Sequence, residues 1–206
     1  MTFESARIDG VRADCIRIAS TGDARAIAAI YAPYVTDTVI SFELEPPGEI
    51  EMAGRIDGVL RRLPWLVCEQ DGDILGYAYA SRHRERTAYQ WSVDAAVYVA
   101  PRAHRRGVGR SLYAVLLAVL RLQGLQGVFA GIALPNDASV GLHEAMGFAP
   151  VGVYRRVGFK LGAWRDVGWW GMALGPAAPD PRPPAEFEAG IFERAKASLA
   201  LEGASR

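Results

Sequence analysis

One segment constrains the fold of this chain more than any other: a short apolar strand that leads through a basic loop into a helix. The strand is 97–99 (Val-Tyr-Val), and the loop with the start of the helix spans 104–111. Gly107 and Gly109 remove side chains that would keep a ligand off the backbone. The first N–H groups of a helix lack partners within it and lie at the positive end of its dipole, so the junction predicts a phosphate site. Three arginines add cationic donors: Arg105, Arg106 and Arg110.

Glycine-rich turns before helices occur in several classes of protein, and a plain tight connection is one interpretation that stays open. The Walker phosphate loop needs a lysine followed by serine or threonine after its second glycine, where this chain has Val108-Gly109-Arg110. The dinucleotide-binding pattern needs a third glycine, and this glycine is missing. The two common nucleotide-binding patterns therefore fit poorly.

Composition excludes several classes of partner. The 206 residues are half hydrophobic, which suits one domain with its own core. Net charge is zero, so no overall field favours nucleic acid or an acidic membrane, and no apolar run reaches the length of a membrane span. The N-terminus has no signal-peptide layout. The two cysteines and three histidines lack metal-ligand spacing, so we expect no metal and a cytoplasmic location.

Hydrophobic periodicity predicts helices and strands in mixed order. The first helix follows a capping cluster at 20–23, and the second covers 49–62 with Ile50, Ile56, Leu60 and Leu63 inward. A third helix follows the glycine loop, and a short fourth begins at Asn136 and ends at Gly147. The expected strands are 15–19, 65–69, 74–81, 89–99, 128–134, 151–156 and 164–174.

The order of these elements suits a single α/β layer structure with a mixed sheet. We expect an N-terminal extension at 1–14 and a domain at 15–175. A proline-rich linker and a helical tail at 176–206 would follow. The tail is weakly amphipathic, so packing on the domain, packing on a partner, or fraying all remain open.

Beyond the glycine loop, further segments occur in a fixed order along the chain. The chain resembles the GNAT superfamily of N-acetyltransferases, and most of all its phosphinothricin and methionine sulfoximine branch, from about residue 16 to about 174. The matching segments outside the loop are 42–43, 64–67, 76–80, 91–94, 134–139, 147–148, 158–160 and 164–168.

The resemblance implies an α+β fold with a central, mostly antiparallel sheet of about seven strands flanked by helices. It also implies acetyl-CoA as co-substrate, with the pyrophosphate on the glycine loop, and a homodimer. The cofactor-binding residues that it implies are Val97, Tyr98, Val99, Arg105, Arg106, Gly107, Val108, Gly109, Arg110, Ser111, Asn136 and Ser139. His104 stands where the family usually has glutamine or arginine. This departure should matter little, because backbone N–H groups do most of the binding.

Asp94 is the candidate general base. It lies mid-strand on the face opposite Val93 and Ala95, where an unpaired carboxylate would be costly. Acetyl transfer needs a neutral amine, so a base within reach of the amine is useful. A salt-bridged structural role, with Arg84 or Arg86 as partner, is the alternative. The family's usual residue is glutamate, one methylene longer.

His143 matches the position that the resemblance assigns to protonating the leaving thiolate, and a helix residue hydrogen-bonded for structure alone is the alternative. The resemblance also implies that a backbone N–H of strand 97–99 stabilises the oxyanion. For the substrate, it implies Arg84, Arg86 and Phe42, together with Asp94. Guanidinium suits carboxylate and phosphinate, although a solvated charged hairpin is an equal alternative for each arginine.

These features predict direct acetyl transfer to the α-amino group of a small amino-acid-like substrate in a ternary complex. An acetyltransferase for another amine (a polyamine, an amino sugar or a protein N-terminus) is the alternative within the enzyme class. A CoA-binding module without catalysis is the alternative outside it. We expect a small-molecule amine as partner, and neither nucleic acid nor a membrane.

Overall fold

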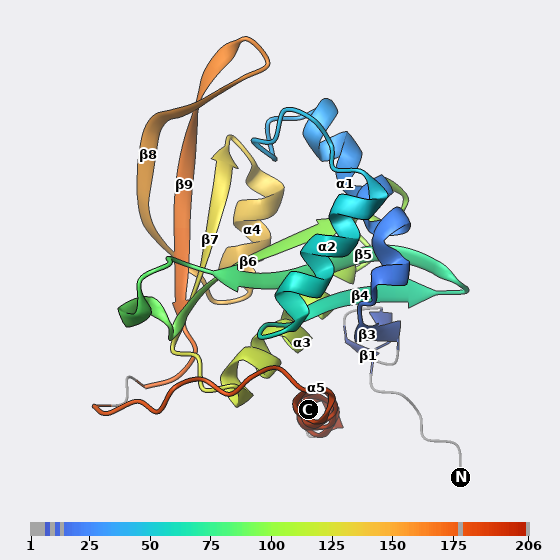
Figure 1. Cartoon of the computed structure of the whole chain (residues 1–206), viewed down its shortest axis with the longest axis vertical. Helices are drawn as coiled ribbons and strands as arrows, with labels where there is room; N and C mark the ends of the chain where they lie inside the picture. Colours follow the sequence, from blue (N-terminus) through green and yellow to red (C-terminus); the bar gives the residue numbers. More distant parts are fainter. Residues whose placement is uncertain (1–6, 9–10, 13–14, 177–178, 205–206) are drawn as a thin grey trace.

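A seven-stranded sheet organises the molecule, a computed structural model that describes residues 7–8, 11–12, 15–176 and 179–204 (Figure 1). The strand order is β3-β4-β5-β6-β7-β9-β8, and only the β6–β7 pair is parallel. The strands are β3 (Ile16–Ile18), β4 (Trp65–Gln70), β5 (Asp73–Arg82), β6 (Ser92–Val99), β7 (Gly127–Leu134), β8 (Ala149–Lys160) and β9 (Ala163–Ala173). This arrangement confirms the predicted fold class. Separate from this sheet, β1 (Arg7–Ile8) pairs with β2 (Val11–Arg12) in the expected extension, most of which lies outside the described residues.

Among the described residues, five α-helices accompany the sheet: α1 (Ala24–Thr36), α2 (Glu49–Leu60), α3 (Val108–Leu122), α4 (Asp137–Ala145) and α5 (Ala189–Ala204). In Figure 1, α1 and α2 cross the near face of the sheet, and α3 lies behind it. Helix α3 is the most deeply buried of them, because its apolar residues recur around most of its circumference and it lies between the sheet and α5.

The β6–β7 pair opens soon after it begins. Its register joins Ser92 to Gly127, Val93 to Val128 and Asp94 to Phe129, and beyond this last pair the two strands are no longer bonded. Both strands nevertheless continue, to Val99 and Leu134. A wedge-shaped gap in the sheet therefore begins directly after Asp94.

Several sequence-based boundaries were wrong. Ile50 is 90% exposed, not inward, because it lies two residues (about 200°) around the helix from the buried Met52. Helix α2 ends at Leu60, two residues early, and β6 begins at Ser92 because 87–89 forms a 3₁₀ turn. Strand β8 extends beyond the expected 151–156 at both ends, and β9 begins and ends one residue earlier than expected.

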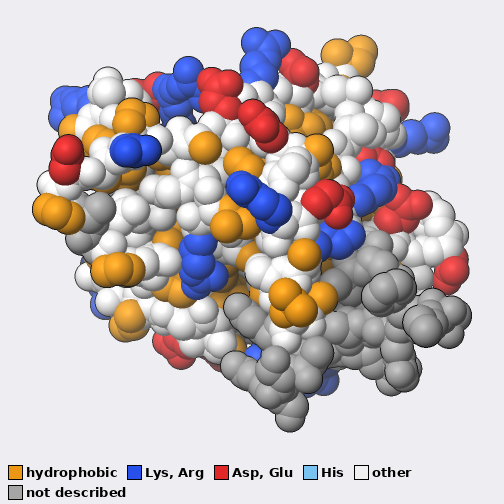
Figure 2. Space-filling model, turned by 90° about the horizontal axis from the view of Figure 1, so that it is seen from below, with side chains coloured by type: hydrophobic (Ala, Val, Ile, Leu, Met, Phe, Trp, Pro, Cys, Tyr) orange, Lys and Arg blue, Asp and Glu red, His pale blue; other side chains and the backbone are white. Residues whose placement is uncertain are grey.

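The C-terminal tail packs on the domain. The Trp91 indole N–H donates to the Arg182 carbonyl (2.8 Å), and the Ala185 N–H donates to the Gln123 carbonyl (2.8 Å). Helix α5 then packs against α3 through buried Phe192 and Ala195. Figure 2 shows acidic and basic side chains interspersed on the face seen from below. The division of the chain into three parts stays a prediction.

Candidate functional site

The loop between β6 and α3 has the backbone geometry that a bound anion needs. Gly107 precedes the first residue of α3 with φ +78°, a left-handed conformation that favours glycine. Gly109 lies close to Leu142, since a Cβ at residue 109 would come within 3.3 Å of the Leu142 side chain. The N–H groups of Val108 and Gly109, in the first turn of α3, have no acceptor within the helix.

The arginines of this loop lie at the surface. Arg105, Arg106 and Arg110 are exposed, and Arg106 donates to the Gln70 side chain (3.3 Å). His104 contacts the Val99 carbonyl through Nε2 (3.0 Å). The residues that resemblance assigned to the pyrophosphate therefore surround one helix terminus, where backbone dipole and cationic side chains favour the same negative charge.

The gap between β6 and β7 holds a cavity of about 60 Å³. Its lining brings together five of the predicted site residues: Val97, Tyr98, Asn136, Ser139 and His143. The Asn136 side chain accepts the Ser139 N–H (3.2 Å), so it caps α4 and lines the cavity at once. Backbone N–H groups of β6 that point toward β7 have no strand to bond beyond Asp94.

His143 is buried, with 3% of its surface exposed, and both ring nitrogens have partners. Its Nδ1 lies 2.7 Å from the Ser139 carbonyl oxygen, so Nδ1 carries the proton and donates it. Burial lowers the pKa of His143, which keeps the ring neutral. The Tyr113 hydroxyl, 3.0 Å from Nε2, is then the donor to this second nitrogen.

Asp94 has a different partner from the two arginines considered in the sequence. Its Oδ1 accepts a hydrogen bond from Nδ1 of His83 at 2.6 Å, and no salt bridge to Arg84 or Arg86 exists among the described residues. Arg84 acts on Asp94 only through its charge. Burial raises the pKa of the Asp94 carboxyl, and the His83 hydrogen bond opposes this effect. The alternative in which Asp94 pairs with Arg84 or Arg86 was wrong, because His83, which follows β5, binds Asp94 on the neighbouring strand β6 and the sequence does not show this contact.

The two arginines expected to bind acid groups line one cavity, of about 350 Å³, whose far wall is the tail segment 183–186. Asp94 does not line this cavity. Arg84 also lies over the Trp169 ring, 5.7 Å from its centroid, and its charge acts on Asp94.

Phe42 sits on a segment that a buried lysine fixes in place. Lys160, 5% exposed, donates to the backbone carbonyls of Val35 (2.6 Å), Ser41 (2.6 Å) and Glu43 (2.9 Å). These three bonds use all the donors of the ammonium group. Burial lowers the pKa of Lys160, and the Glu43 carboxylate opposes that shift.

The Phe42 ring lies against the bare Cα of Gly158 on β8, where a Cβ would clash with it. Glu43, next in the chain, binds Arg55 of α2 through both carboxylate oxygens, at 2.7 and 2.9 Å. The Tyr31 hydroxyl of α1 donates to the same carboxylate (2.9 Å). One short segment therefore ties two helices to the β8–β9 hairpin.

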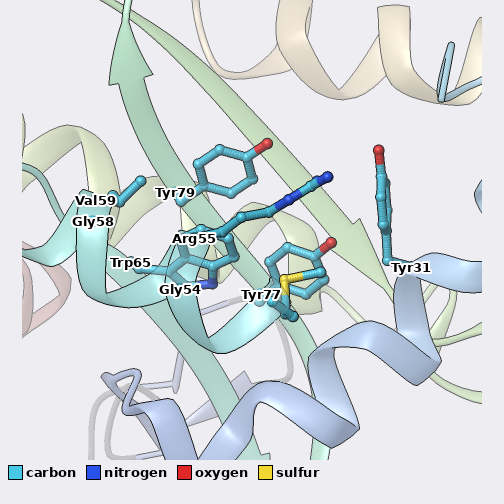
Figure 3. A pocket seen from close by; sticks show the side chains of 9 residues that line it. Tyr31, Gly54, Arg55, Gly58, Val59, Trp65, Tyr77 and Tyr79 are labelled. Carbon is cyan, nitrogen blue, oxygen red and sulfur yellow. The ribbon is translucent and has the colours of Figure 1, made fainter. Parts of the chain in front are cut away.

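An aromatic pocket of about 310 Å³ lies beneath this network (Figure 3). Trp65 stacks on Tyr79 with ring centroids 4.3 Å apart, and Arg55 extends over the pocket toward Tyr31 (Figure 3). Tyr79 pairs with Ala96 and Ser81 pairs with Asp94, so Tyr79 and Asp94 project from the same face of the sheet. The pocket and the candidate base therefore share one side of the sheet.

The sequence analysis does not identify two residues that the structure brings to this region: His83, which binds Asp94, and Lys160, which binds the segment 35–43. Nothing in the local sequence marks Lys160, because its acceptors are backbone carbonyls in the distant segment 35–43. His83 gave no local signal, because its partner is on another strand.

Comparisons with known proteins agree with this geometry. The sequence profile of the family described as Acetyltransferase (GNAT) domain matches residues 16–169. The phosphinothricin N-acetyltransferase of Streptomyces viridochromogenes is 41% identical over 168 residues, which cover 82% of this chain and 91% of that protein. An L-methionine sulfoximine/L-methionine sulfone acetyltransferase of Salmonella typhimurium is 32% identical, over 80% of this chain and 98% of that protein.

A solved structure supports the same family. A GNAT superfamily phosphinothricin acetyltransferase from Sinorhizobium meliloti, in complex with AcCoA, superposes with a TM-score of 0.79 at 32% identity. The match covers 86% of this chain and 97% of that one. Among the described residues, no helix is long and apolar enough to cross a membrane.

Proposed function

Because the chain belongs to the family of GNAT acetyltransferase domains, we propose that it transfers an acetyl group from acetyl-CoA to the α-amino group of a small, anionic, amino-acid-like substrate. Phosphinothricin and methionine sulfoximine are the model substrates, since relatives are named for them. One observation carries the proposal: the gap between β6 and β7 opens between the N-terminus of α3 and Asp94. A thioester bound in the gap would then lie between an anion site and a base.

Acetyl-CoA supplies an activated acetyl thioester. The chain's own residues fit it, because the first turn of α3 offers backbone N–H groups to the pyrophosphate. Arg105, Arg106 and Arg110 add charge, and Asn136 and Ser139 line the gap through which the pantetheine arm would pass. A backbone N–H of 97–99 that points away from β5, into the gap, would donate to the developing oxyanion.

The basic function of the site depends on Asp94, which lies at the lip of the gap and whose pKa is raised by burial. The candidate donor for the departing thiolate is His143. Its ring is neutral before the reaction, and its proton is donated to Ser139. His143 therefore has less geometric support than Asp94, and a His143→Gln variant tests it through the rate of thiol release.

Arg84 is the substrate-binding residue best supported by position, because it is close enough to Asp94 for its charge to act there. The role of Phe42 rests on the family resemblance. Arg86 would reach an acid group only from the neighbouring cavity. A guanidinium beside the base favours an anionic amino acid over a polyamine, because a second cation would be repelled.

A thiol-release assay with mass analysis of the product tests this function. L-Phosphinothricin, L-methionine sulfoximine and spermidine are compared at equal concentration. We expect one free thiol for each N-acetylated amino acid, and little turnover of spermidine. Turnover of spermidine alone would contradict the proposed substrate class, and acetyl-CoA binding without thiol release from any amine would contradict the enzyme.

We further propose a homodimer in the cytoplasm. The β8–β9 hairpin exposes a set of large apolar side chains, which a second copy of the chain would cover: Val151, Tyr154, Val157, Phe159, Leu161 and Trp164. Light scattering should give twice the chain mass for the wild type and a single chain mass for Phe159→Glu. The cytoplasmic location is supported by Cys68, a buried cysteine that forms no disulfide.

A further inference from the structure

His83 and Asp94 form a hydrogen-bonded pair with a defined direction. His83 Nδ1 lies 2.6 Å from Asp94 Oδ1. A carboxylate only accepts hydrogen bonds, so Nδ1 carries a proton and donates it to Asp94, and in the neutral ring the lone pair is on Nε2. The pair therefore presents a free imidazole nitrogen as its basic atom, with the carboxylate behind it.

Aromatic rings on three strands or loops hold the His83 ring in place. It stacks on Phe129 of β7, with centroids 4.6 Å apart and planes 28° from parallel. Tyr89 and Trp169 contact it edge-on, at 6.1 and 6.0 Å. With 15% of its side chain exposed, the ring has little freedom to leave Asp94.

His83 Nε2 has no hydrogen-bond partner among the described residues. Nε2 is not one of the buried side-chain atoms that lack a partner, so this unpartnered nitrogen is accessible to solvent. A structural histidine of this kind would normally use both nitrogens, as His143 does. His83 instead has one nitrogen fixed and one nitrogen free.

The pair lies where the reaction is proposed to occur. Asp94 and Phe129, which hold the ring by hydrogen bond and by stacking, are the last bonded residues before β6 and β7 separate. The Asp94 side chain is short, and His83 already binds one of its oxygens. The far nitrogen of the His83 ring, Nε2, is therefore a basic atom at the outer end of the pair.

We propose that His83 Nε2 is the base that deprotonates the acceptor amine, and that Asp94 is the residue that orients His83 and stabilises its protonated form. This inference rests on the proposed function and assigns its base to a residue that neither the family resemblance nor the relatives identify.

The chemistry balances as follows. His83 Nε2 takes one proton from the substrate ammonium, which leaves a neutral amine with a lone pair. The amine nitrogen attacks the thioester carbonyl, a C–N bond forms, and the C–S bond breaks. The nitrogen loses a second proton, the thiolate gains one, and His83 returns its proton to solvent. The net products are an N-acetyl amino acid, a free thiol and one proton.

The test compares His83→Gln, His83→Ala and Asp94→Asn, with Ala88→Ser as a control on the same exposed loop. We expect His83→Gln to lower kcat about 100-fold or more, the range of a lost general base, with the KM for acetyl-CoA unchanged. Added imidazole should restore part of the rate of His83→Ala and none of the rate of Asp94→Asn. Ala88→Ser should behave as wild type.

A His83→Gln enzyme within about threefold of wild type would overturn the proposal, as would a large loss that imidazole does not rescue in His83→Ala. A nitrogen NMR measurement keeps the inference separate from the proposed function, because it needs no turnover. It should show Nδ1 protonated and Nε2 unprotonated in the neutral ring, and Asp94→Asn should abolish this preference. The opposite tautomer would overturn the proposal even if the enzyme is active.

Discussion

The two halves of the site are built differently. The cofactor half is one continuous stretch, in which β6, the glycine loop and the first turn of α3 follow one another in the chain, and its donors are mainly backbone groups. The acceptor half is assembled from side chains far apart in sequence: Lys160 bonds to the carbonyl of Val35, 125 residues away, and Glu43 bonds to Arg55.

Because of this difference, the two halves should tolerate side-chain substitutions to different degrees. A site made from backbone N–H groups depends on local conformation, so side chains around it can vary. A site made from paired side chains depends on every partner, because removing one leaves a buried group unsatisfied. Substitutions should therefore affect one half while leaving the other intact.

The largest effect is expected from Asp94→Asn. An amide carries no negative charge, so it cannot stabilise the protonated His83 ring, and it holds the Nδ1 proton less firmly than a carboxylate does. Because the base His83 then loses its support, we expect kcat to fall by about 10²–10⁴-fold, the range for a lost general base. Steady-state kinetics at saturating substrates measures it. Activity near that of wild type would show that the acceptor half does not depend on this side-chain pair.

The next largest effect is expected from Lys160→Met. The methionine keeps the volume but leaves three backbone carbonyls without their donor, so we expect a loss of roughly 2–3 kcal/mol in the free energy of unfolding. The KM for the acceptor should rise, because Phe42 and Glu43 lose their support, and the Kd for acetyl-CoA should not change.

Lys196→Met is the matched control, since Lys196 makes one long bond to the Ile16 carbonyl on the other side of the domain. Denaturant unfolding and acceptor kinetics of the two variants separate the roles. Equal behaviour of the two lysine variants would mean that the segment 35–43 does not need its buried ammonium group.

A smaller effect is expected in the cofactor half from Gly107→Ala. The left-handed conformation at this residue costs an alanine about 1–2 kcal/mol, which predicts a roughly tenfold weaker Kd for acetyl-CoA. Gly124→Ala, at the other end of α3, has a similar φ of +85° and should lose stability without losing affinity. Calorimetric titration of both variants measures the difference. Equal affinities would show that the loop conformation does not control binding.

The smallest effect is expected from pH. The Arg55 guanidinium lowers the pKa of the Glu43 carboxyl below its ordinary value of 4.5. The stabilisation from Glu43 is therefore complete above pH 4.5 and is lost as the pH falls through the lowered pKa. Glu43→Gln should lack this part of the acid dependence. Unfolding curves between about pH 5 and pH 3 test this, and parallel losses in both proteins would contradict it.

The contrast between the halves also explains what the sequence could predict. The order of strands and helices, the glycine loop and the position of Asp94 follow from periodicity and motif spacing, which are local properties. The partner of Asp94 could not be predicted, because His83 returns to β6 only after β5 ends and the rings of Phe129 and Trp169 gather around it. The inward position of Ile50 was wrong because the buried face of α2 is set by Met52 and Ile56.

The most direct test of the separation is a calorimetric titration of acetyl-CoA into Asp94→Asn. Asp94 belongs to the acceptor half, and the backbone groups of Val108 and Gly109 lie beyond the end of β6. We expect a Kd for acetyl-CoA equal to that of the wild type in a protein that no longer turns over. A Kd weakened in proportion to the lost kcat would show instead that the two halves form a single coupled site.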